Sequence, residues 1–106
     1  MITRDEAKKL ADELIFTTLL QTALIPNAKG WSEVDALCYA FSACIMAKAF
    51  PGVDPENENF TRAVAAQAAT LACAIDAGAL SKQYIYDSYV DLVQEANEEN
   101  NENRGY

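Results

Sequence analysis

Three long stretches of this 106-residue chain carry no charged side chain, although the formal net charge of the whole chain is −8. They cover residues 14–28, 36–47 and 63–75. Alanine is the commonest residue in the last two, and it has the highest intrinsic helix propensity. A helix that is apolar on every side must be covered on every side. The stretches therefore predict helices with more apolar surface than a chain of this length buries alone.

Start and stop signals divide the chain into four predicted helices. Thr3 and Glu6 have the spacing of a capping box, in which a hydroxyl and a carboxylate bind the free amides of a helix start. Ser32 and Asp35 repeat that spacing. Gly78 has the place of the left-handed residue that follows many helices. We predict one domain, residues 1–96, with helices at about 4–24, 33–49, 59–77 and 82–96.

The predicted fold class is all-α, a compact four-helix bundle-like domain. Small side chains dominate residues 63–74, so neighbouring backbones can approach closely and we expect the third helix to be central. Residues 97–106 are polar and acidic and have no apolar period. We therefore expect this segment to be a frayed tail.

The first two helices each show two apolar lines, whereas a helix in a monomeric bundle keeps one polar face. A large exposed apolar patch is unusual on a monomer, and twofold association is the commonest form of oligomer. We therefore predict a homodimer formed through helices 1 and 2. The alternative is a tightly wrapped bundle in which helices 2 and 3 are largely interior. The predicted self-association residues are Phe16, Leu20, Tyr39 and Met46.

The residues that usually carry catalysis are missing from this chain. It has no histidine, the commonest general base and metal ligand,. Its cysteines, Cys38, Cys44 and Cys73, lie in apolar stretches without the spacing of a zinc site,. They are predicted to be buried free thiols, which fits a reducing compartment. We predict no catalytic residues, no cofactor, no metal and no enzymatic activity.

Charge and hydropathy restrict the partners. Only Lys8 and Lys9 are adjacent cations, and acids flank them, so direct binding of nucleic acid is not expected,. No segment has the length of a membrane span or the pattern of a signal peptide. We predict a cytoplasmic protein without a membrane partner.

What remains is a small acidic helical protein that acts by stoichiometric binding to another protein. Regulators and inhibitors such as anti-activators, immunity factors and phage counter-defence proteins work in this way. Tyrosine gives a large contact area at low entropy cost, so the fourth helix is the predicted partner surface. Its tyrosines could instead cover the rim of the domain's own core. The predicted partner-binding residues are Tyr84, Tyr86, Asp87, Tyr89, Asp91 and Glu95.

Two further functions stay open at this point. An acidic helix face that leads into an acidic tail could mimic nucleic acid and block the basic groove of a DNA- or RNA-binding protein. The chain could also be a structural subunit of a larger assembly, which would form open or high-order complexes in place of a closed dimer.

Overall fold

A computed structural model describes residues 2–22 and 31–104, with the side chains at 22 and 98–104 left out. The described part is all-helical, as predicted. Its helices are α1 (Arg4–Thr22), α2 (Glu33–Ala49), α3 (Glu58–Asp76) and α4 (Lys82–Arg104). The predicted bounds of the second helix are confirmed, and those of the third differ by one residue at each end. Residues 23 and 24, the predicted end of the first helix, lie outside the described residues.

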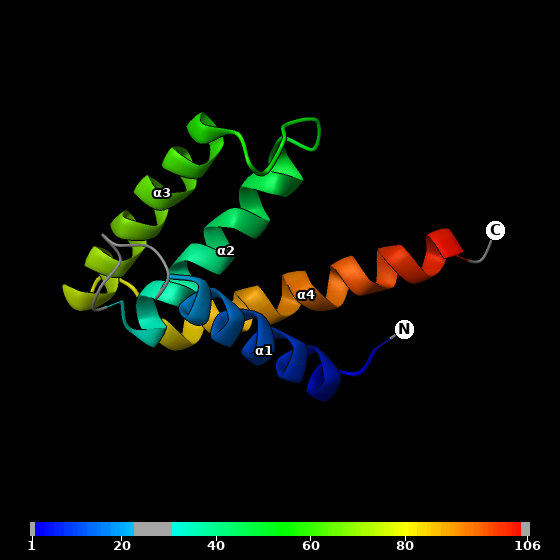
Figure 1. Cartoon of the computed structure of the whole chain (residues 1–106). Coiled ribbons are helices and arrows are strands. Elements are labelled where there is room, and N and C mark those ends of the chain that lie inside the picture. Colours follow the sequence, from blue (N-terminus) through cyan, green and yellow to red (C-terminus); the bar gives the residue numbers. More distant parts are fainter. Residues whose placement is uncertain (1, 23–30, 105–106) are drawn as a thin grey trace.

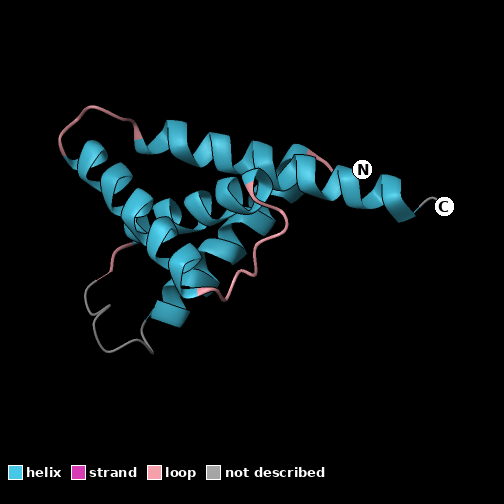
Figure 2. Ribbon diagram, turned by 90° about the horizontal axis from the view of Figure 1, so that it is seen from above, coloured by secondary structure: helices cyan, strands magenta, loops and turns pink. Residues whose placement is uncertain are grey.

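The helix α2 occupies the centre of the domain. It packs against α1, α3 and α4, whereas α1 and α4 also pack against each other. Figure 1 shows α3 on one side of α2, and α1 and α4 on the other. The last turns of α4 extend away from the other helices, as both Figure 1 and Figure 2 show. This extension helps to make the longest dimension of the molecule 44 Å, against 29 and 25 Å for the other two.

The main core lies between α1, α2 and α4. The helix α1 contributes the small residues Ala7 and Ala11, both fully buried, so its backbone lies close to its neighbours. Larger apolar side chains from the other two helices fill the remaining space, and their burial is the main driving force for this packing. These are Leu37 and Phe41 of α2, and Ile85, Tyr89, Val90 and Val93 of α4.

The prediction that the third helix is central is wrong. The helix α3 packs mainly against α2, and its buried residues are Phe60, Val64 and Ala68. Most of its other alanines are exposed. Alanine favours the helical state, but its methyl group gains little from burial. An alanine-rich helix can therefore lie at the edge of a domain at low cost.

The helix ends follow the sequence signals, except at the end of α4. Thr3 and Glu6 exchange hydrogen bonds in both directions, and Ser32 and Asp35 form a complete capping box. The helix α4 continues to Arg104, past the predicted end at residue 96. The predicted tail is thus helical over residues 97–104. Neither glycine nor proline interrupts residues 79–104, so no strong breaker ends the helix, although the four asparagines among residues 97–104 are weaker helix formers than the glutamates beside them,.

Candidate interaction groove

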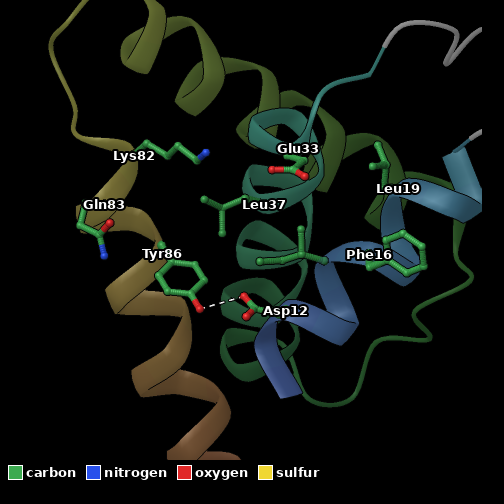
Figure 3. Close-up of a pocket in the computed structure, with 9 residues that line it drawn as sticks. Asp12, Phe16, Leu19, Glu33, Leu37, Lys82, Gln83 and Tyr86 are labelled. Carbon is green, nitrogen blue, oxygen red and sulfur yellow. Dashed lines mark hydrogen bonds between the residues drawn. The ribbon is translucent and has the colours of Figure 1, made fainter. Parts of the chain in front are cut away.

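An open cavity of about 480 Å³ lies where α1 meets the first turns of α2 and α4. We call it the α1 groove, and Figure 3 shows its lining. Three helices contribute to it because α2 and α4 both start beside the second half of α1. The lining residues are Asp12, Ile15, Phe16 and Leu19 of α1, Glu33 and Leu37 of α2, and Lys82, Gln83 and Tyr86 of α4.

The deepest part of the α1 groove is apolar. Leu37 is only 2% exposed and belongs to the main core. Ile15 and Leu19 are half-buried, whereas Phe16 is 60% exposed. Residues three and four apart share a helix face, which explains why Asp12, the two aliphatic residues and Phe16 reach the same cavity. The groove therefore combines a buried apolar base with an exposed aromatic ring.

A hydrogen bond between α1 and α4 crosses the α1 groove. The Tyr86 hydroxyl donates to Oδ1 of Asp12 over 2.8 Å (Figure 3). Partial burial, together with this hydrogen bond to a carboxylate, raises the pKa of Tyr86 to about 12. The phenol is thus neutral at physiological pH and remains a donor. Asp12 keeps further acceptor capacity, because a carboxylate has about four lone-pair sites.

The charges around the α1 groove are mixed. Lys82 and Glu33 point toward each other from α4 and α2 at one end of the groove (Figure 3). They form no ion pair; the salt bridges between described side chains lie elsewhere. With Asp12, the lining has two carboxylates and one ammonium group. The net charge of the groove is therefore negative.

The predicted self-association residues occupy two helices and differ in exposure. Phe16 and Leu20 of α1 are 60% and 54% exposed. Tyr39 and Met46 of α2 are half-buried. The Tyr39 ring also packs on Trp31, with 5.6 Å between the ring centroids. Only the α1 pair therefore offers large apolar side chains to solvent.

The predicted partner-binding tyrosines of α4 have three different environments. Tyr84 is 64% exposed, as expected for a contact residue. Tyr86 lines the α1 groove. Tyr89 is 4% exposed and part of the main core, so its assignment to an exposed patch is corrected. Tyrosine is apolar enough to fill a core position, and here it covers the domain's own interior.

The predicted partner-binding acids of α4 have neighbours within the domain. Asp91 pairs with Arg4, and Glu95 pairs with Lys48 over 2.6 Å. Asp87 accepts a hydrogen bond from Gln83. These contacts use much of the acidic face to hold α4 against α1 and α2.

The structure thus brings together Phe16 and Tyr86, which the sequence assigns to two different surfaces. The other seven lining residues are not among the predicted self-association or partner-binding residues. Helical spacing places Asp12 beside Phe16 and Lys82 beside Tyr86, since each pair is four residues apart. Periodicity does not say which helices meet, so the groove itself has no signal in the sequence.

The thiols and carboxylates outside the groove do not form a second site. Among the described residues, no group of three or more cysteine, aspartate or glutamate side chains could hold a metal ion. Cys38 is buried, Cys44 is half-buried, and Cys73 is exposed, contrary to the prediction of burial. Burial raises the pKa of the Cys38 and Cys44 thiols. Both therefore remain protonated and unreactive near neutral pH.

None of the helices in the described ranges is long and apolar enough to cross a bilayer.

The chain matches no family model, no curated protein and no solved structure. We therefore infer its function from the geometry and chemistry of the α1 groove.

Proposed function

We propose that this protein acts by stoichiometric binding to another protein, as a regulator or inhibitor, and that the α1 groove is the binding site. The observation that supports this most is the exposure of Phe16 beside an apolar cavity. Contact residues that contribute most to protein binding are often aromatic side chains next to well-packed pockets. An exposed ring at such a place is stabilised when a partner covers it.

The apolar surface extends beyond the cavity. Leu20 does not line the groove, yet it is 54% exposed and lies one helical turn after Phe16,. Sites for small molecules usually enclose most of the ligand, so a small molecule here would lie within the cavity. It would then leave Leu20 in water. A protein segment along α1 would cover both side chains, which favours a protein partner.

We propose a non-enzymatic role. The polar groups of the groove are a carboxylate that accepts a hydrogen bond from a neutral phenol, a second carboxylate, an amide and an ammonium group. No nucleophile with an adjacent base is found among them. Regulation by binding needs only a complementary surface. Cytoplasmic location stays a prediction from the sequence.

Mimicry of nucleic acid is less well supported. A mimic needs a continuous acidic surface, and cations lie beside two acids of the α4 face,. A role as a subunit of a large assembly has no specific observation in its favour.

A photoreactive phenylalanine analogue tests the proposed site. It replaces either Phe16 or Phe50, which is also an exposed phenylalanine at 53% but lies outside the groove. The protein is expressed in its native cells and irradiated. We expect a covalent adduct of one defined mass, other than twice the chain mass, at position 16 and none at position 50. Equal adducts at both positions, or none at position 16, would show that the groove is not the binding site.

Self-association through Phe16 and Leu20 would cover the same surface as a partner protein, so it is the alternative proposal and needs its own test. Light scattering on a sizing column measures the mass of the protein across a micromolar dilution series. A homodimer has twice the chain mass of 11.6 kDa, or about 23 kDa,. If Phe16 and Leu20 form the interface, Leu20→Gln restores the monomer mass. A monomer at every concentration would exclude the predicted homodimer.

A further inference from the structure

We infer that the α1 groove binds a basic amphipathic helix of the partner protein. This inference rests on the proposed function and adds the shape and charge of the bound segment. It rests on two features of the groove, the direction of its apolar side chains and the charge of its lining, and on the charge of the whole chain.

The apolar side chains favour a helical occupant. Phe16 and Leu20 form an exposed apolar line along α1, and Ile15 and Leu19 form a half-buried line beside it. A helix presents side chains at the same repeat, three or four residues apart, so two of its anchors can meet successive turns of α1. Leu37 closes the base of the cavity between them. This geometry is typical of grooves that accept an amphipathic helix.

The charge of the lining favours a basic occupant. Asp12 lies one turn before Phe16, so it stands at one end of the exposed apolar line,. Glu33 stands across the groove on α2 and has no ion pair among the described side chains. One lysine, Lys82, opposes these two carboxylates. Basic side chains that flank the apolar anchors would meet the carboxylates, whereas acidic ones would meet like charge.

The charge of the whole chain points the same way. The net charge of the chain is −8, so the whole protein attracts a cationic segment. This attraction acts over a longer distance than the attraction by the few charges of the groove. A second copy of this chain would bring the same negative charge to the groove. Complementary charge mainly governs specificity and association rate, so a basic partner is favoured over a second copy.

Two synthetic peptides test the inference. Each has about 16 residues, which is long enough to form several helical turns. Both carry leucines at the helical spacing i, i+3, i+4 and i+7. The positions that flank these leucines are lysine in one peptide and glutamate in the other. Fluorescence anisotropy measures the binding of each to the full protein. At about 50 mM salt we expect the lysine peptide to bind at least about tenfold more tightly, and the ratio to shrink at about 500 mM salt.

Matched variants locate the interaction. Phe16→Gln should weaken the lysine peptide by about tenfold or more, because it removes a central aromatic anchor. Leu14→Gln changes another exposed apolar residue of α1, one outside the groove, and should stay within about twofold,. Glu33→Gln should reduce the preference for lysine by about threefold. Glu13→Gln removes the same charge from outside the groove and should leave the preference unchanged.

Each contrary result has a distinct meaning. Equal binding of both peptides, or equal effects of Glu33→Gln and Glu13→Gln, would overturn the assignment of a basic segment. A dimer mass that Phe16→Gln abolishes, together with no binding of either peptide, would identify a second copy as the occupant. An adduct at position 16 without a charge preference would leave the proposed function in place and reject only this inference. Peptide binding that depends on Phe16, without an adduct in cells, would show that the groove accepts such a peptide but would reject a partner protein, and both proposals would fail.

Discussion

Replacement of Leu37 by alanine tests whether this side chain both supports the core and forms the base of the α1 groove. Leu37 is 2% exposed, so the substitution removes three buried side-chain carbon atoms with their hydrogens. At about 0.8 kcal/mol for each group, the lost transfer free energy is about 2.4 kcal/mol. A sealed cavity would add to this cost, but here the vacated space joins an open groove that water can enter. We therefore expect a loss of about 2–3 kcal/mol, at the low end of the range for such substitutions.

Urea denaturation of Leu37→Ala, followed by the fluorescence of the single tryptophan and by circular dichroism, measures this loss,. Leu14→Ala is the matched control, because Leu14 is 47% exposed and does not line the groove. Its cost should be below about 1 kcal/mol, since half of the side chain is already in water. A cost of less than about 1 kcal/mol for Leu37→Ala would refute its burial in the core. A cost above about 4 kcal/mol would indicate a sealed cavity and refute the open groove.

Three further predictions concern other parts of the fold. The folded-state pKa of Tyr86, about 12, is above the ordinary value of 10, so the stability that this phenol provides is complete below pH 10 and is lost as the pH rises toward 12,. Tyr86→Phe, which also loses the hydrogen bond to Asp12, should remove only its own share of that fall in denaturation curves, because burial raises the pKa of Tyr89 to about 12 as well. Cys73 should react first with a thiol reagent and the buried Cys38 only on unfolding, so a fast reaction of both thiols would contradict their placement. Gly78→Ala should cost about 1–2 kcal/mol by denaturation, because φ is 77° there; a Cβ would meet no neighbour, so the backbone strain is the only cost,.

The helix starts could be predicted because their signals are local. The side chains of Ser32 and Asp35 bind amides within their own helical turn, so the bond pattern depends on residues a few positions apart,. The same holds for Gly78, whose left-handed backbone follows α3. The length of α4 could not be predicted from the apolar period, because a helix that meets no breaker can continue past its last apolar residue.

The arrangement of the helices could not be predicted in the same way. An alanine-rich sequence predicts a helix but does not decide whether the helix is central or peripheral, so α3 was misplaced. Tyr84 and Tyr89 are the same residue type on the same helix, yet one is exposed and the other is buried. The difference comes from the contacts that α4 makes with α1 and α2. The α1 groove depends on side chains from three helices, and its polar bridge joins residues 74 positions apart. Such long-range pairing has no local pattern in the chain.

The pairing of α1 with α4 has a consequence for the order of folding. Arg4 and Asp91 are separated by 87 positions, and Gln94 bonds to the carbonyl of Ile2 across 92. By contrast, α2 and α3 are neighbours in the chain and can pair through a short loop, which is the faster process. During synthesis α1 leaves the ribosome first, yet one of its two neighbours is made last. The face of α1 that packs on α4, with the fully buried Ala7 and Ala11, therefore stays uncovered until α4 has been made.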